Sequence, residues 1–228
     1  NPAGGLARRH GAVRAAREAG AAVLLDAGDA LFRGSPDADP PGAEARARLV
    51  LAEMGRLSYA AMAVGERDLA FGADWLVREA AAAGVPLLCA NLSAADGGRP
   101  FEASRLVEAG GHRVGVFAVL GAGPLPGGLD ASDPADAARR EAAALRGRGA
   151  ELVVGLLHLP APAARRLAAE VTGLDVAAVA HDGLLQGAEV RGGADLRAPI
   201  IAFVKKGAVL PIDRRAGAWY RIVGKSGP

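Results

Sequence analysis

The chain is poor in cysteine and in aromatic residues, and it has no long apolar segment. Cys89 is the only cysteine among 228 residues, so no disulfide can form within the chain. No run of about 18 apolar residues occurs, which argues against a transmembrane helix. Hydrophobic residues make up 51% of the chain but aromatic residues only 4%, so we expect a core of small, closely packed side chains.

The charges nearly balance, with 27 lysines and arginines against 25 aspartates and glutamates. The sequence lacks the clustered basic residues with interleaved aromatic residues that mark nucleic-acid-binding surfaces. Arginine pairs such as Arg139–Arg140 lie in helix-like stretches, where a solvated helix face explains them. We therefore expect no nucleic-acid partner.

Short β-rich runs alternate with alanine-rich helical stretches along most of the chain. Helices are predicted over 6–19, 43–57, 74–83, 134–146 and 163–171. Strands are predicted over 22–26, 59–64, 85–90, 105–108, 113–120, 151–157 and 176–180, and three more over 199–204, 208–213 and 218–223. The pattern predicts a sheet covered by helices, with a strand-only extension. Flexible breaks at 34–42 and 121–128 are too short for interdomain linkers, so we expect one domain.

Polar residues stand where four of the predicted strands end. Asp29 and Glu66 follow the first two strands, and His158 and His181 follow two later ones. Because functional side chains gather at the carboxyl ends of strands in such sheets, we expect these four to converge. Carboxylates and imidazoles are suitable ligands for Zn²⁺ and similar ions. Each residue alone has an ordinary explanation, such as turn formation for Asp29, but their joint placement favours a metal site.

Three further signals have mainly structural interpretations. The segment GAGPLPGG at 121–128 follows a strand, but it lacks the G-x-G-x-x-G spacing and its prolines remove backbone N–H donors. Cys89 lies in an apolar strand, which is typical of a buried structural thiol. Asn91 follows the same strand, and we expect it to fix a loop by hydrogen bonding to the backbone. Contact of Asn91 with substrate is the weaker alternative.

Six short motifs occur in order along the chain: GGLARR, LLDAGDALFRGS, YAAMAVGERDLAFG, PLLCANLS, LLHL and GLDVAAVAHDG. Their order and spacing resemble the 5′-nucleotidase branch of the calcineurin-like metallophosphoesterases, over nearly the whole chain. The resemblance implies a four-layer α/β/β/α sandwich that uses divalent metal ions, Zn²⁺ or Mn²⁺, to hydrolyse phosphate monoesters. Nucleotides are the expected substrates, and the bacterial periplasm or exterior is the expected location.

The resemblance also assigns roles to the metal-site residues. Asp29 matches an aspartate that bridges two metal ions, and His158 and His181 match histidine ligands of one of them. Glu66 stands in place of a ligating asparagine, which a carboxylate oxygen can imitate. Gly183 stands in place of a second histidine ligand, so the expected site is reduced to one ion or none.

Arg67 stands where the family has a histidine that protonates the leaving group. A guanidinium does not release its proton near neutral pH, so Arg67 is expected to clamp phosphate instead. Alternatively, Arg67 pairs with Asp29 or Glu66 and fills the vacant metal position.

The resemblance leads to one expected domain over residues 1–228. The family's Asp-x-His motif should precede GGLARR, so an N-terminal strand is expected to be missing. The separate nucleotide-specificity domain of the family is not expected within this chain, and other domains of a longer protein are among its expected partners. The leading interpretation is a hydrolase with a reduced metal site. The alternative is a non-catalytic binding or scaffold module of the same fold.

Overall fold

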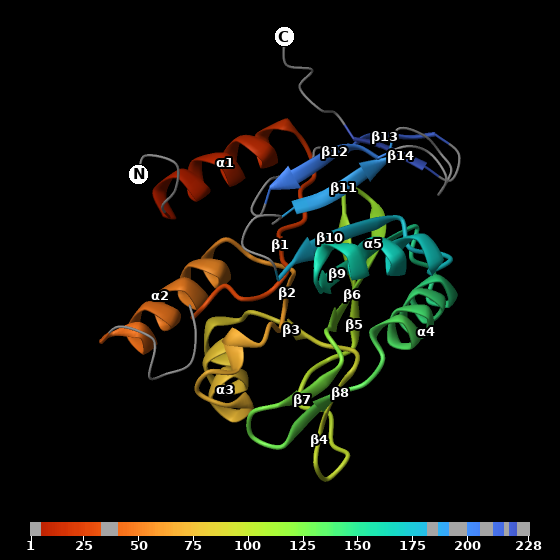
Figure 1. Cartoon of the computed structure of the whole chain (residues 1–228). Helices are drawn as coiled ribbons and strands as arrows, with labels where there is room; N and C mark the ends of the chain where they lie inside the picture. The colour runs from red at the N-terminus through yellow and green to blue at the C-terminus, as the bar shows by residue number, and fades with distance from the viewer. Residues whose placement is uncertain are drawn as a thin grey trace.

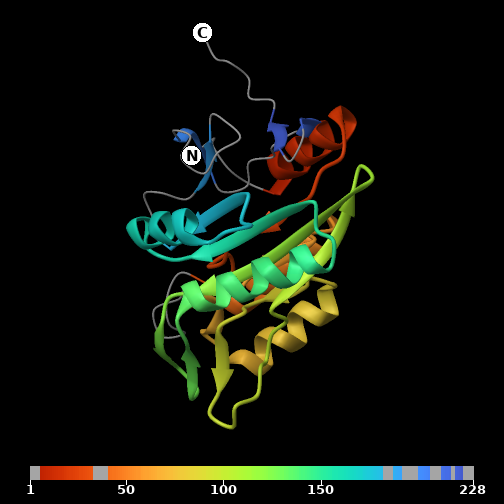
Figure 2. The same cartoon turned by 90° about the vertical axis from the view of Figure 1, so that its right-hand side faces the viewer.

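The computed structural model describes residues 6–32, 41–181, 187–191, 200–205, 212–216 and 219–222, and it shows a mixed α/β arrangement (Figures 1 and 2). The helices are α1 (Leu6–Ala19), α2 (Ala43–Arg56), α3 (Ala73–Ala83), α4 (Pro134–Gly147) and α5 (Ala161–Glu170), with a 3₁₀ turn η1 (Arg67–Leu69). None of the helices in this part of the chain is long and apolar enough to cross a membrane.

Two sheets carry most of the fold. The smaller one is parallel, in the order β1 (Leu25–Asp26), β2 (Ala61–Ala63) and β3 (Leu87–Leu88). The larger one has the order β12-β11-β10-β9-β6-β5, and its strands β6, β9 and β10 are parallel. The strands of the larger sheet are β5 (Ser104–Ala109), β6 (His112–Leu120), β9 (Leu152–His158), β10 (Val176–Ala180), β11 (Gly187–Arg191) and β12 (Ile200–Lys205).

Two small antiparallel sheets complete the described strands. One has the order β4 (Leu92–Ala94), β8 (Leu129–Ala131) and β7 (Gly123–Leu125), and the other pairs β13 (Ile212–Ala216) with β14 (Trp219–Ile222). The predicted flexible break at 121–128 is therefore wrong, because it contains β7 and the turn into β8. Pro124 is compatible with this pairing because β7 lies at the edge of its sheet. The predicted break at 34–42 lies almost wholly outside the described residues.

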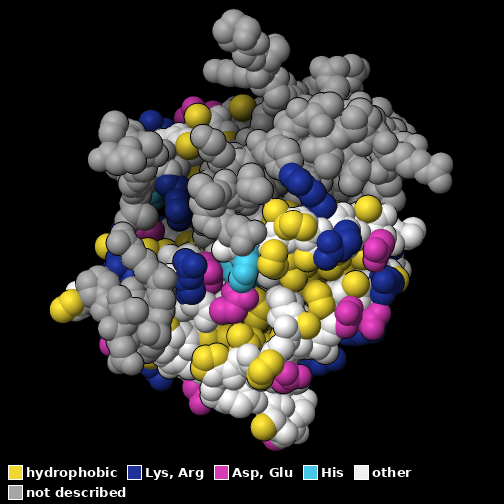
Figure 3. All heavy atoms as spheres, in the orientation of Figure 1, with side chains coloured by type: hydrophobic (Ala, Val, Ile, Leu, Met, Phe, Trp, Pro, Cys, Tyr) yellow, Lys and Arg dark blue, Asp and Glu magenta, His cyan; other side chains and the backbone are white. Residues whose placement is uncertain are grey.

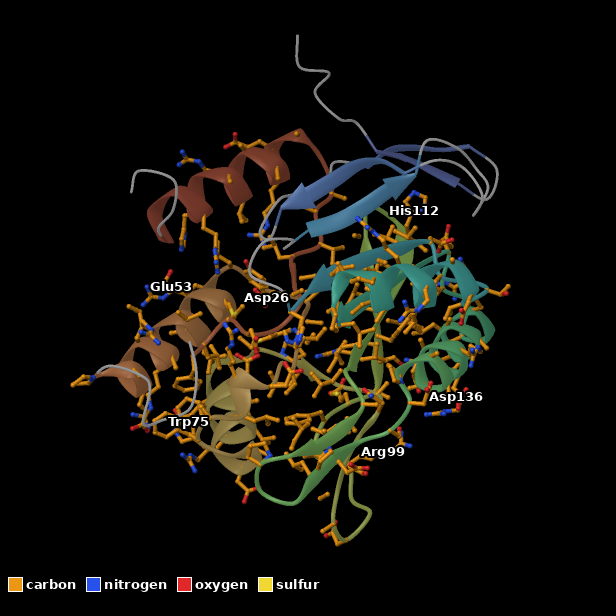
Figure 4. All side chains as sticks on the ribbon, in the orientation of Figure 1. Asp26, Glu53, Trp75, Arg99, His112 and Asp136 are labelled. Carbon is orange, nitrogen blue, oxygen red and sulfur yellow. The ribbon has the colours of Figure 1, made fainter. Side chains whose placement is uncertain are left out.

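Apolar clusters hold helices against the outer faces of the two main sheets. The cluster on the β1-β2-β3 side includes Met54 of α2, Met62 of β2 and Leu76 of α3. Trp75 of α3 donates a hydrogen bond from Nε1 to Glu44 of α2, at 2.9 Å, which ties the two helices together (Figure 4). A second cluster packs α4 and α5 against the larger sheet.

A third cluster lies between the two main sheets, where β2 contacts β6 and β9. Its described members are alanine, valine and leucine side chains, among them Ala63, Leu88, Val116 and Leu156. The expected core of small side chains is thus found at the sheet-to-sheet contact. Small side chains on both faces let the parallel strands of the two sheets end near one another.

Candidate metal centre

The carboxyl end of β9 forms the middle of the site. His158 is the last residue of β9, and the parallel register pairs it with Leu120 of β6 and with Ala180 of β10. His181 follows Ala180 directly, so both histidines emerge at the same edge of the larger sheet. The His158 side chain is fully buried, whereas that of His181 is about a third exposed.

Two loops from the smaller sheet bring the carboxylates to this edge. Asp29 lies in the loop after β1 and has a left-handed backbone with φ of 57°. Asp26 shapes this loop by accepting a hydrogen bond from the N–H of Gly28, at 2.9 Å (Figure 4). Glu66 follows β2 at the entry to η1, and the N–H of Arg67 donates to Asp29 Oδ1 at 2.9 Å.

The four side chains lie together as predicted. Nε2 of His158 is 2.8 Å from Glu66 Oε2 and 3.4 Å from Asp29 Oδ2, and Nδ1 of His181 is 3.4 Å from Glu66 Oε1. One ligand atom each from Glu66, His158 and His181 lies within 4.8 Å of the other two. The predicted convergence is confirmed, while the role of these residues as metal ligands stays a prediction.

The hydrogen bonding of the imidazoles fits a cation at this point. Nδ1 of His158 lies 2.9 Å from the carbonyl oxygen of Ala27, which suits an Nδ1–H donor and directs Nε2 toward the carboxylates. Among the described residues, His158 Nε2 and His181 Nδ1 are buried without a well-directed hydrogen bond, although Glu66 oxygens lie close to both. A backbone carbonyl on the second ring nitrogen is the usual way in which proteins orient a metal-binding histidine.

The charges of the cluster are strongly coupled. Burial by itself lowers the pKa of His158, but the close charged contacts with Asp29 and Glu66 outweigh it and raise this pKa to about 10. Burial raises the pKa of both carboxyl groups, yet their interactions with His158 leave both pKa values below the ordinary range. The cluster therefore attracts positive charge, which a proton on His158 or a divalent ion can provide.

Arg67 lies at the rim of the cluster. Its Nε is 3.5 Å from Asp29 Oδ2, and its side chain is 51% exposed. The predicted pairing of Arg67 with Asp29 is therefore present. The guanidinium is also exposed enough for a ligand to reach it from solvent. Figure 3 shows a histidine side chain on the surface of this face, directly beside acidic and basic side chains. The role of Arg67 as a phosphate clamp stays a prediction.

Asn91 has the predicted structural role. Its Nδ2 donates to the carbonyl oxygens of Leu120 and Ser132, both at 2.7 Å, and its Oδ1 accepts from the N–H of Leu120 at 2.9 Å. The side chain thus joins the end of β6 to the segment after β8. The weaker idea that Asn91 contacts substrate stays a prediction. Cys89 is buried as expected, and burial raises the pKa of its thiol to about 12.

Sequence reasoning missed the importance of Asp68. This carboxylate is fully buried and accepts three backbone hydrogen bonds, from Asp29, Leu31 and Gly65. Burial, together with the nearby charge of Asp29, raises its pKa to about 7, although the backbone donors oppose this shift. The motif GERD contained the residue, but nothing in it pointed to the two donors that lie 37 and 39 residues away along the chain.

Gly65 makes the close approach of the two loops possible. A Cβ atom added there would lie 2.3 Å from Asp29 Oδ1 and 2.8 Å from His158 Cε1. We expect Gly65→Ala to lower the free energy of unfolding by about 1–3 kcal/mol, as overpacking does, and to weaken metal binding. Thermal unfolding and metal titration measure the two effects.

Gly147→Ala is the matched control for Gly65→Ala, because a Cβ at Gly147 meets nothing within 4 Å. It should leave metal binding unchanged and should not lower the free energy of unfolding, since alanine is at least as favourable as glycine in helix α4. Equal behaviour of the two variants would contradict the tight packing at Gly65.

Fold and site together define a mixed α/β domain with a candidate metal centre at the strand ends. No family model and no curated protein matches the sequence. Among solved structures, the chain is similar to a 5′-nucleotidase precursor from Thermus thermophilus, with a TM-score of 0.66 and 27% identity over 78% of this chain. It is also similar to a calcineurin-like phosphoesterase from Bacillus subtilis, with a TM-score of 0.70 and 17% identity over 97% of this chain.

A third similar structure is the NAD nucleotidase of Haemophilus influenzae, with a TM-score of 0.54 and 18% identity over 77% of this chain. The predicted resemblance is confirmed: the chain has the fold of a metallophosphoesterase domain of the 5′-nucleotidase type. It spans 36% of the Thermus protein, 34% of the Haemophilus protein and 80% of the Bacillus chain.

Proposed function

We propose that this chain is a hydrolase domain for phosphate monoesters, with nucleotides as the expected substrates. One divalent ion, Zn²⁺ or Mn²⁺, would be held by Glu66, His158 and His181, with Asp29 beside it. The observation that carries the proposal is the pair of buried imidazole nitrogens that face Glu66 without a well-directed hydrogen bond. Two histidines and one glutamate are a known ligand set for catalytic zinc, which leaves a coordination position open.

A divalent ion in this position supplies a nucleophilic water at neutral pH and polarises a phosphoryl oxygen. The protein residues then have separate tasks. The carbonyl of Ala27 holds the His158 ring, and the N–H of Arg67 holds Asp29 Oδ1. The exposed guanidinium of Arg67 is placed to bind phosphate oxygens, for which its planar fork is well suited.

The same proposal includes a four-layer α/β/β/α sandwich formed as one domain over residues 1–228. Its support is the order of apolar clusters: helices α2 and α3, the smaller sheet, the larger sheet, and helices α4 and α5 (Figure 1). We further propose a bacterial periplasmic or extracellular location, with other domains in a longer protein. The motif resemblance is the support for these two points.

Metal analysis together with an activity assay tests the proposal. Purified protein should bind about one Zn²⁺ or Mn²⁺ per chain and hydrolyse nitrophenyl phosphate and a nucleoside monophosphate only when metal is present. Binding should also release protons, because the metal displaces the proton that His158 carries below pH 10. Calorimetry in two buffers of different ionisation enthalpy measures that release, and affinity should rise with pH.

A non-catalytic module is the alternative outcome. Stoichiometric metal binding without hydrolysis of any phosphate ester would support it. Absence of metal binding at every pH would overturn the proposed function altogether.

A further inference from the structure

Asp68 is the most deeply buried acidic side chain near the site. It is fully buried, and it follows Glu66 by two residues in η1. Its two oxygens point at backbone N–H groups. Oδ2 accepts from Asp29 at 2.8 Å and from Gly65 at 3.0 Å, and Oδ1 accepts from Leu31 at 3.1 Å.

The three donors belong to two different loops. Asp29 and Leu31 lie in the loop after β1, whereas Gly65 immediately precedes Glu66 in the loop after β2. A single carboxylate therefore joins the backbone of one loop to that of the other, next to both Asp29 and Glu66. Hydrogen bonds from backbone N–H groups to a carboxylate are among the stronger ones in proteins.

The backbone of Asp29 needs such a restraint. Its φ of 57° lies in the left-handed region, which residues other than glycine adopt less readily. The hydrogen bond from the Asp29 N–H to Asp68 holds this conformation, and the conformation turns the Asp29 carboxylate toward His158, 3.4 Å away. Without Asp68, the loop is free to relax toward an ordinary conformation.

We propose that Asp68 is a positioning residue that sets the spacing between Asp29 and Glu66 and thereby the affinity of the site for its metal. This inference rests on the proposed function, because it assumes that the cluster binds a metal. Loss of an outer partner that orients metal ligands lowers metal affinity by about 10–100-fold in other proteins. We expect a loss of that size here.

The test compares Asp68→Asn with Asp175→Asn. An asparagine at 68 keeps the shape but replaces one acceptor oxygen by an N–H₂ group, which faces a backbone donor and cannot accept from it. Asp175 is a matched control because it also accepts a backbone N–H, that of Val153 at 2.6 Å, and an arginine, Arg146. It precedes β10 at the amino end, roughly 16 Å from the metal cluster by strand length.

Zn²⁺ affinity is measured by competition with a chelating dye, at a temperature well below the melting of each variant. Asp68→Asn should weaken Zn²⁺ binding 10–100-fold and change the visible spectrum of the Co²⁺-loaded protein. Asp175→Asn should lower the melting temperature but leave Zn²⁺ affinity and the Co²⁺ spectrum unchanged. If Asp68→Asn does not fold, Asp68→Glu, which keeps both oxygens, is measured in its place and should show a smaller loss of affinity.

The outcomes separate this inference from the proposed function. Wild-type protein that binds no metal overturns both. Wild-type protein that binds Zn²⁺ with unchanged affinity and spectrum in the Asp68 variants overturns only the positioning role, and leaves Asp68 as a residue that merely stabilises the fold.

Discussion

Replacing His158 by alanine is expected to abolish tight metal binding and hydrolysis together. His158 is the fully buried member of the cluster, and its Nε2 faces both Glu66 and Asp29. Loss of a ligand removes a metal bond, so the loss of affinity should exceed the 10–100-fold that follows loss of an outer partner. The free energy of unfolding of the metal-free protein should also fall by about 3 kcal/mol, because two partly buried carboxylates then lack their cationic partner.

His112→Ala is the control for this prediction. His112 is also partly buried and paired with a glutamate, Glu151, at 3.2 Å. It begins β6, at the end opposite to Leu120, roughly 26 Å from the site by strand length (Figure 4). Calorimetric Zn²⁺ titration and thermal unfolding should show normal metal binding in His112→Ala. Tight Zn²⁺ binding in His158→Ala would remove His158 from the ligand set.

Substitution of Arg67 should change how the rate depends on the leaving group. A guanidinium can hold phosphate oxygens but cannot protonate a departing alkoxide near neutral pH. The wild-type protein should therefore hydrolyse nitrophenyl phosphate much faster than an alkyl phosphate. Arg67→His should preserve or raise activity and reduce this difference, whereas Arg67→Ala should raise KM by about 10–100-fold, the value of one or two lost charge-assisted hydrogen bonds.

The same Arg67→Ala variant tests the alternative role as a substitute cation. If Arg67 mainly neutralises Asp29, its removal should raise the affinity for Zn²⁺ or Mn²⁺, because a competing positive charge is gone. The free energy of unfolding should change by less than about 1 kcal/mol, since the Arg67 side chain is half exposed and its Nε is 3.5 Å from Asp29 Oδ2. Unchanged KM, metal affinity and melting temperature would leave Arg67 as an ordinary surface residue. Arg78→Ala, an exposed arginine on α3 paired with Glu79, is the control.

The helices of this fold are readable from the sequence, and the strands less so. The predicted bounds of α1 are those observed, because an alanine- and arginine-rich stretch followed by a glycine defines a helix locally. The apolar run 22–26 predicted a longer strand than β1, which pairs with β2 only at Leu25 and Asp26. An apolar run indicates burial, whereas a strand also needs a partner whose register the sequence does not specify.

The convergence of the four candidate ligands was predictable for a geometric reason. Parallel strands end at one edge of a sheet, so residues just after such strands meet even when they are far apart in the chain. The support around them was not predictable. The carbonyl of Ala27 and the three N–H groups bound by Asp68 are backbone atoms, and any residue type supplies them.

The candidate ligands come from both main sheets, so metal binding would affect the order in which the protein unfolds. Asp29 and Glu66 follow strands of the smaller sheet, and His158 and His181 lie at strand ends of the larger one, so an ion bound in this cluster would link the two sheets across the alanine, valine and leucine layer between them. Because these residues lie far apart along the chain, we expect the ion to bind only after both sheets have formed. We expect removal of the metal by a chelator to weaken first the contact between the two sheets, while each sheet stays packed against its own helices.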